Sequence, residues 1–133
     1  MPNEPRWKQR YKNFEKAFQF FENSIEKPGY SQLEIAGLVQ SFEFTFELAW
    51  KTIKDFLYEQ GIQTDFPIEA IKAGFQYQVI EDGHLWLEML EKRNELSHTY
   101  NAEVAENAVD VIKNRYYFGI KQVYEYIKLK IEN

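Results

Sequence analysis

The sequence predicts an all-α protein, an antiparallel four-helix up-and-down bundle with one additional short helix. Apolar residues recur every three or four positions through almost all of the 133 residues, which is the spacing of one helix face. Glycine and proline are confined to a few short intervals, and no segment alternates in the manner of a half-buried strand. We expect residues 1–133 to form a single domain, because this length supports one hydrophobic core.

The first two helices are predicted by clear start and stop signals. The first runs from about Pro5 to Ile25 and ends at Lys27-Pro28-Gly29. The second begins near Ser31, which can cap it together with Glu34 three residues later, and it ends at Gly61. The positions expected to face the core are Trp7, Tyr11, Phe14, Phe18, Phe21 and Ile25 in the first helix, and Ile35, Leu38, Phe42, Phe46, Ala49, Ile53 and Phe56 in the second.

The second predicted helix also carries apolar residues outside its main stripe. Phe44 lies roughly opposite Phe42 and Phe46, and Leu48 and Trp50 widen the apolar surface further. A helix that is apolar on several sides is expected to be largely covered by its neighbours.

The second half of the chain predicts three more helices. Pro67 suits the first turn of a short accessory helix, and Glu81-Asp82-Gly83 suits a turn before a fourth helix from about His84 to Leu96. A helix start explains His84 fully. The fifth helix follows Asn101, which is a good N-cap, and continues to near the C-terminus.

Composition narrows the classes of function. A net charge of −5 argues against a protein that tracks long nucleic acid, although it leaves room for a short RNA contact. The chain has no cysteine and only two histidines, without any recognisable ligand spacing, so we expect no metal site and no cofactor. The N-terminus lacks an apolar leader, and no run of about 18 apolar residues occurs, so we expect a soluble, cytoplasmic protein.

The strongest functional signal is the segment RNELSHTY, from Arg93 to Tyr100. Arg93 can grip a phosphate through two parallel hydrogen bonds, and His98 can exchange a proton near neutral pH. Residues five apart on an unbroken helix point about 140° away from each other, so these two converge only if the helix ends or bends first. Asn94 and His98, four apart, would be neighbours even on a continuous helix. Tyr100 could serve function or simply a contact between helices.

Two carboxylates of the second helix are candidates for orienting Arg93. Glu43, Glu47 and Lys51 form a ladder with four-residue spacing, which is typical of pairing along the exposed edge of one helix. The alternative is that Glu43 or Glu47 reaches across the bundle and holds the arginine in place.

The motif and its surroundings resemble a known family. The pattern Arg93-Asn94-x-x-x-His98-x-Tyr100 is similar to the Arg-x(4)-His-x-Tyr signature of the HEPN superfamily, specifically of the HepT-like proteins. These are also named nucleotidyltransferase substrate-binding proteins. The segments FEFTFELAWK, residues 42–51, and WLEMLEKRN, residues 86–94, resemble that family's two most distinctive segments. The resemblance covers essentially the whole chain.

The resemblance implies a homodimer in which Arg93 and His98 of both subunits meet at the two-fold axis. It also implies a separately encoded minimal nucleotidyltransferase as partner. In the toxin members, the Arg and His form a metal-independent endoribonuclease, and the partner acts as antitoxin by transferring AMP to the motif tyrosine, here Tyr100. Other members are described only as substrate-binding subunits of the nucleotidyltransferase.

Elementary chemistry is compatible with RNA cleavage by these residues. RNA carries its own nucleophile, the 2′-hydroxyl, so the protein need only move protons and stabilise charge on the phosphorane. As a hypothesis, His98 is the general acid or base, Arg93 holds the scissile phosphate, and Asn94 fixes the imidazole or a phosphate oxygen. Two alternatives stay open: a non-catalytic adaptor for the nucleotidyltransferase, and a purely structural helical dimer.

Overall fold

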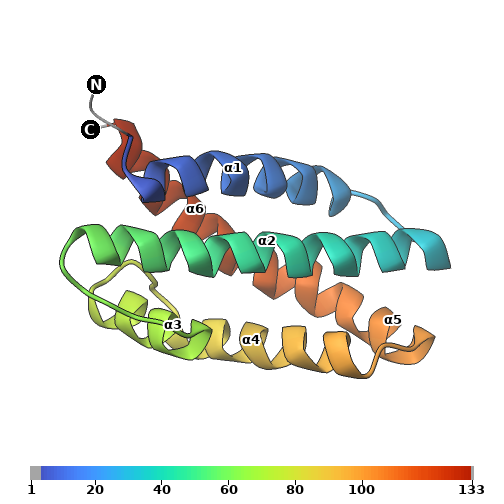
Figure 1. The fold of residues 1–133 in the computed structure, drawn as a ribbon. Coiled ribbons are helices and arrows are strands. Elements are labelled where there is room, and N and C mark those ends of the chain that lie inside the picture. The colour runs from blue at the N-terminus through green and yellow to red at the C-terminus, as the bar shows by residue number, and fades with distance from the viewer. Residues whose placement is uncertain (1–3, 133) are drawn as a thin grey trace.

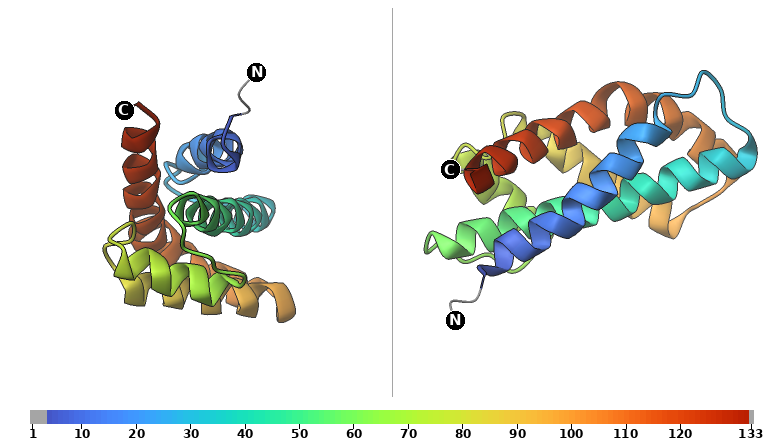
Figure 2. Two further views of the ribbon diagram at one scale, coloured as in Figure 1. Left: turned by 60° about the vertical axis from the view of Figure 1, so that its left-hand side comes forward. Right: turned by 90° about the horizontal axis from the view of Figure 1, so that it is seen from above.

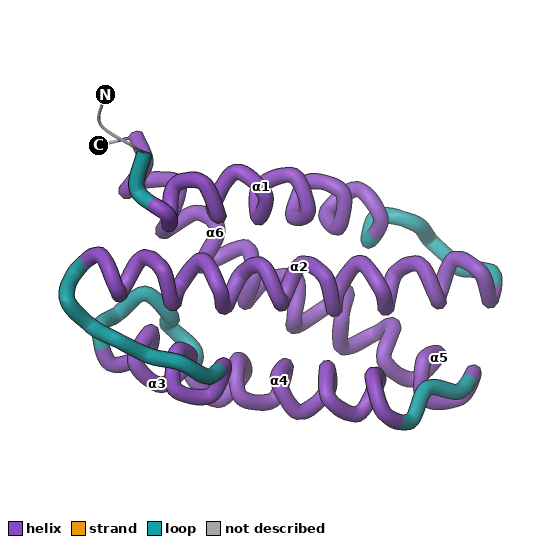
Figure 3. The backbone as a smooth tube through the Cα atoms, viewed as in Figure 1, coloured by secondary structure: helices purple, strands orange, loops and turns teal. Residues whose placement is uncertain are grey.

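The computed structural model describes residues 4–132 as helices joined by short connections (Figures 1 and 3), and no strand occurs among them. The all-α prediction is confirmed. None of the helices in this stretch is both long enough and apolar enough to span a membrane. The elements are α1 (Arg6–Ser24), α2 (Gln32–Glu59), α3 (Pro67–Gln76), α4 (Gly83–His98), α5 (Ala102–Val111), the π-helical segment η1 (Ile112–Tyr116) and α6 (Tyr117–Glu132).

Helix α2 occupies the middle of the bundle. Helix α1 lies along one side of it, α4 lies along the other, and the run from α5 to α6 crosses behind them (Figures 1 and 2). The four long elements alternate in direction, and α3 sits beside the start of α4 (Figure 1). This is the predicted four-helix up-and-down bundle with one short additional helix.

The predicted caps form at the ends of the helices. Ser31 Oγ accepts a hydrogen bond from Glu34 N at 3.2 Å, and Glu34 Oε1 accepts one from Ser31 N at 2.9 Å. Gly61 ends α2 with a φ of 86°, a left-handed conformation that glycine adopts without strain. Pro67 occupies the first turn of α3, and Asn101 caps α5 by accepting from Val104 N at 2.9 Å.

The last predicted helix is continuous but not uniform. A π-helical turn at Ile112–Tyr116 interrupts the α-helical pattern between α5 and α6. Two adjacent buried tyrosines lie where η1 passes into α6. Tyr116 donates from its hydroxyl to Glu88 of α4 at 2.8 Å, whereas Tyr117 donates to Glu22 of α1. Consecutive residues point about 100° apart around a helix axis, so these two neighbours reach different helices.

Aromatic side chains fill the core but do not all lie inside it. Phe42 stacks on Tyr116 with ring centroids 5.4 Å apart, and Phe46 packs 5.6 Å from Trp86. Phe44, in contrast, is 61% exposed. Trp50 is buried and Leu48 is partly buried against the core, so the expectation that α2 is largely covered is confirmed for most of this helix and fails at Phe44.

Candidate functional site at the end of helix α4

The motif residues lie at the C-terminal end of α4 and in the connection that follows. Helix α4 extends two residues beyond the predicted end at Leu96, and its last turn closes when Thr99 N donates to Glu95 O at 2.8 Å. The predicted break thus falls after His98 rather than before it. Arg93 and His98 consequently project about 140° apart around the helix axis. One chain does not bring these two side chains to one face.

Arg93 lies at the seam between α4 and α2. Its Nη1 donates to Glu47 Oε2 at 2.9 Å, and its guanidinium carbon is 5.9 Å from the centroid of the Phe46 ring, within cation–π range. Its Nε is buried and has no hydrogen-bond partner among the described residues. The side chain is 22% exposed. Arg93 is therefore a largely enclosed cation with unused hydrogen-bonding capacity.

Glu47 is held by two further donors of its own helix. Trp50 Nε1 donates to the same Oε2 at 3.0 Å, and Lys51 Nζ lies 3.3 Å from Oε1. The two alternatives for this residue are therefore both realised, because Glu47 pairs along α2 and also reaches across to Arg93. The hydrogen bond from Trp50 to Glu47 was not predicted from the sequence, where Trp50 was assigned only to the apolar surface of the helix. Its three-residue spacing from Glu47 was the available signal.

Glu43 also reaches α4, but its partner there is Ser97. Ser97 Oγ donates to Glu43 Oε2 at 3.0 Å. The two contacts lie one helical turn apart on each helix, with Glu47 opposite Arg93 and Glu43 opposite Ser97. Of the two candidate carboxylates, Glu47 is the one that contacts the arginine.

Asn94, His98 and Tyr100 lie on the exposed side of this region. All three are exposed, Tyr100 by 50%. Between residues 4 and 132, no side-chain hydrogen bond joins them to one another or to other residues, and no group of three or more His, Asp or Glu side chains could hold a metal ion. The fold brings them to the same end of α4 as Arg93 without direct contact. Their catalytic and modification roles stay predictions.

A second arginine–carboxylate pair on α4 was not predicted. Arg115 of η1 donates to Glu88 through Nη1 at 2.7 Å and through Nη2 at 3.1 Å. These hydrogen bonds, followed by that of Tyr116, lower the pKa of the Glu88 carboxyl. Burial and then the bond to Glu88 raise the pKa of the Tyr116 hydroxyl. The π-helical turn that presents this pair has no recognisable signal in the sequence.

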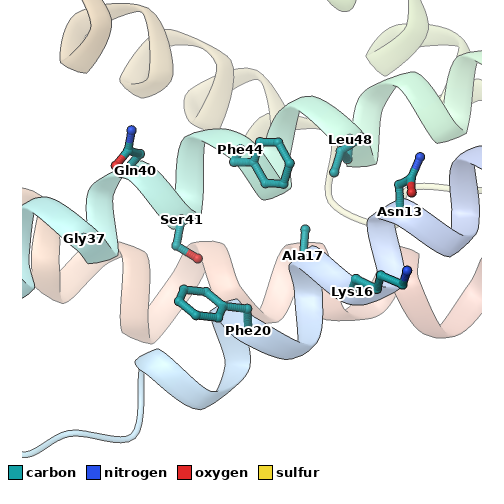
Figure 4. A pocket seen from close by; sticks show the side chains of 9 residues that line it. All are labelled: Asn13, Lys16, Ala17, Phe20, Gly37, Gln40, Ser41, Phe44 and Leu48. Carbon is teal, nitrogen blue, oxygen red and sulfur yellow. The ribbon is translucent and has the colours of Figure 1, made fainter.

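An open groove lies between α1 and α2 (Figure 4) and has a volume of about 720 Å³. Phe20 and Phe44, which are 69% and 61% exposed, border it. Ala17 and Gly37 also line it, and a Cβ added at Gly37 would meet nothing within 4 Å. Of the described residues that line the groove, Lys16 is the one ionisable residue. This surface is apolar, shallow and free of carboxylates.

The fold and the motif together define a helical-bundle protein with Arg, His and Tyr side chains at the end of one helix and in the connection after it. Residues 9–129 match the family described as nucleotidyltransferase substrate binding protein like. The match covers most of the 133 residues, and the chain belongs to this family.

Individual relatives agree with this assignment. The chain is 35% identical over 77 residues to a protein of Haemophilus influenzae named probable ribonuclease HepT, a match that covers 53% of this chain and 52% of that protein. The match thus spans about half of that relative's length. A crystal structure of a Thermus thermophilus protein has a TM-score of 0.76 and 27% identity, covering 83% of this chain and 94% of the other.

A second solved structure, also from Haemophilus influenzae, has a TM-score of 0.77 and 24% identity and covers 89% of this chain and 98% of that one. That structure is described as the fold of a substrate-binding domain of a nucleotidyltransferase. At this identity the likeness establishes the shared fold.

Proposed function

We propose that this protein is a metal-independent endoribonuclease, the toxin of a pair with a separately encoded minimal nucleotidyltransferase. The observation that carries the proposal is the cluster at the end of α4, where the largely enclosed Arg93 cation is held across the seam and the His98 imidazole is exposed nearby. The name of the Haemophilus influenzae relative, probable ribonuclease HepT, supports the ribonuclease activity, and the family description supports the link to a nucleotidyltransferase.

The proposed reaction uses the 2′-hydroxyl of RNA as nucleophile. A His98 imidazole accepts the hydroxyl proton while the 2′-oxygen bonds to phosphorus. The bond from phosphorus to the 5′-oxygen breaks, and an imidazolium gives that oxygen a proton, which leaves a 2′,3′-cyclic phosphate and a 5′-hydroxyl. Arg93 binds the phosphate and stabilises the charge that builds up on it. Asn94, one turn before His98, holds the imidazole or a phosphate oxygen.

The proposed functional unit is a homodimer. Arg93 and His98 point in different directions from one α4, so a second copy is needed to complete an Arg–His site. The proposed contact surface includes the α1–α2 groove, where two exposed phenylalanines offer apolar area. Because carboxylates are absent from its lining residues, two chains that each carry a net charge of −5 can approach there with little repulsion.

Tyr100 is the proposed site of control by the partner. Its phenol oxygen would attack the α-phosphorus of ATP on the nucleotidyltransferase and lose its proton to solvent. The bond from that phosphorus to the bridging oxygen breaks, so AMP is transferred and pyrophosphate leaves. Tyr100 is 50% exposed and lies two residues beyond His98. AMP attached here would add a bulky, negatively charged group beside the histidine, which would block the approach of RNA.

The alternative function is that of a non-catalytic subunit that presents a substrate to the nucleotidyltransferase. The family description and the net charge of −5, which does not favour RNA binding, support this alternative. It differs from the first proposal in one respect that can be measured: it predicts binding of the nucleotidyltransferase without cleavage of RNA.

The deciding experiment is cleavage of a mixed RNA pool by the purified protein in EDTA. Arg93→Ala and His98→Ala should abolish cleavage, whereas His84→Ala, which removes the other histidine, should leave it unchanged. Circular dichroism would establish that each variant is folded. Cleavage that survives in folded His98→Ala would refute the assigned site, and absence of cleavage by the wild-type protein would favour the non-catalytic subunit.

A further inference from the structure

The guanidinium of Arg93 has three nitrogen atoms in three different environments. Nη1 donates to Glu47, and Nε is buried without a partner among the described residues. Nη2 makes no hydrogen bond within residues 4–132 and is not among the buried unpaired atoms, so it touches solvent. Nη2, next to the Nη1 that Glu47 binds, is therefore the donor that a ligand can reach. Because Nη1 carries a second N–H, this end of the planar guanidinium can offer two parallel donors to a phosphate.

Glu47 keeps other partners that do not depend on Arg93. Trp50 Nε1 donates to Oε2 at 3.0 Å, and Lys51 Nζ is 3.3 Å from Oε1. These two donors tie the carboxylate to its own helix. Because both come from α2, their contacts with Glu47 do not require the arginine. The carboxylate can thus act as a fixed anchor.

Arg93 needs such an anchor because its side chain is long and has many rotamers. An arginine loses up to about 2 kcal/mol of conformational entropy when it is ordered. The Phe46 ring supports the guanidinium at 5.9 Å but gives it no defined rotation in its own plane. A charge-assisted hydrogen bond to Glu47 supplies that definition.

We propose that Glu47 is a positioning residue, which holds Arg93 at the α2–α4 seam so that its Nη end faces an incoming phosphate. This inference rests on the proposed function, in which Arg93 binds the scissile phosphate of RNA. It assigns no proton transfer and no substrate contact to Glu47. Its effect passes entirely through the orientation of the arginine.

The first test measures cleavage by Glu47→Gln and Glu47→Ala, with Glu91→Gln as the matched control. Glu91 is an exposed carboxylate on α4 without a side-chain partner among the described residues, so its variant removes the same charge near the motif. We expect kcat to fall about tenfold in Glu47→Gln, which keeps one acceptor oxygen, and about a hundredfold in Glu47→Ala. KM should change by less than about threefold, because the arginine acts mainly on the transition state. Equal losses in Glu47→Gln and Glu91→Gln would show an effect of net charge and overturn the inference.

The second test observes the Arg93 guanidinium directly by NMR and does not require RNA. In the wild-type protein its N–H signals should be resolved and exchange slowly with water, as expected for a held group with a buried Nε. In Glu47→Ala they should merge and exchange faster, while Glu91→Gln should resemble the wild type. A freely rotating Arg93 in the wild-type protein overturns the inference whatever the cleavage result. A held Arg93 in a protein that cleaves no RNA overturns the proposed function and leaves the positioning intact.

Discussion

Two arginine–glutamate pairs join α4 to its neighbours, and they differ in how much of the guanidinium they use. Arg115 gives both Nη groups to Glu88, at 2.7 and 3.1 Å. Arg93 gives Nη1 alone to Glu47, at 2.9 Å. The Arg115 side chain is 53% exposed, whereas that of Arg93 is 22% exposed. The more exposed arginine is thus the one with the more complete pairing.

The comparison shows that an ion pair alone does not distinguish a structural arginine from a functional one. Arg115 is satisfied by its glutamate and ties η1 to α4. Arg93 keeps donors in reserve at a place where solvent is partly excluded, which makes an interaction with a phosphate stronger than it would be in water. We expect the arginine that keeps unpaired guanidinium N–H groups, and that belongs to the motif, to be the one that matters for activity.

The largest expected effect comes from replacing Arg93 by lysine, with the same replacement at Arg115 as the comparison. Arg93→Lys keeps the charge but loses the planar fork, so RNA cleavage should fall on the order of a hundredfold or more. Arg115→Lys should leave cleavage within about threefold, because both Nη groups of this exposed arginine are already occupied by Glu88. Initial rates on one defined RNA measure both. Equal losses in the two variants would remove the distinction between the pairs.

A large effect is also expected at Phe44, because the Arg93 site is proposed to need a second copy of the chain. Phe44→Glu places a carboxylate in the proposed contact and should weaken self-association by roughly thirtyfold or more, the effect of about 2 kcal/mol. Phe118→Glu is the control, since Phe118 is 57% exposed but lies on α6, away from the groove. Analytical ultracentrifugation measures the association. Unchanged association in Phe44→Glu would move the contact to another face.

A smaller effect on cleavage is expected at Tyr100, which lies beyond the arginine pairs. Tyr100→Phe should leave cleavage within about threefold, because the tyrosine is assigned no proton transfer in the reaction. The same variant should no longer gain the mass of one AMP when it is incubated with the nucleotidyltransferase and a nucleoside triphosphate. The control variant Tyr58→Phe changes another exposed tyrosine and should still gain AMP at Tyr100. Intact-mass spectrometry measures this gain. If Tyr100→Phe still gained the mass of one AMP, Tyr100 would be excluded as the acceptor.

The smallest expected effect is on stability and concerns the Arg115 pair. The pKa of Glu88 is lowered below its ordinary value of 4.5, so the charged form stabilises the fold above that pH, and the contribution is lost as pH falls through the folded-state pKa. Glu88→Gln should therefore lower Tm slightly near neutral pH, because solvent weakens an ion pair that is largely exposed. Thermal unfolding followed across pH should show the two proteins converging below pH 4.5. If the difference in Tm between the two proteins stayed constant across pH, Glu88 would act by hydrogen bonding and not by its charge.

Most of the helical framework could be predicted because its signals are local. The caps at Ser31, Pro67 and Asn101 each act over three or four residues, and the apolar stripes follow directly from helical periodicity. The end of α4 was predicted less well. Ser97 and His98 are indifferent helix formers, yet the helix includes both, since Glu43 binds the Ser97 hydroxyl and Thr99 closes the last turn.

The site was predicted by residue type, but not by its contacts. Arg93, Asn94, His98 and Tyr100 were recognised as a group suited to phosphate chemistry, and their roles stay predictions. Glu43 and Glu47 were equal candidates in the sequence, and the packing of α2 against α4 gave Arg93 to Glu47 alone. Spacing along one helix cannot show which of two carboxylates faces a second helix.

The sequence by itself determined most helix starts and stops, which faces are apolar, and which eight residues carry the motif, because these depend on neighbours within one or two turns. Only the tertiary structure decided that Glu47 meets Arg93 across 46 positions of sequence. It also decided that Tyr116 and Tyr117 bind glutamates of different helices, and that Phe44 stays uncovered. The physical reason is that contacts between distant residues follow from how whole helices pack, which no single stretch of the chain specifies.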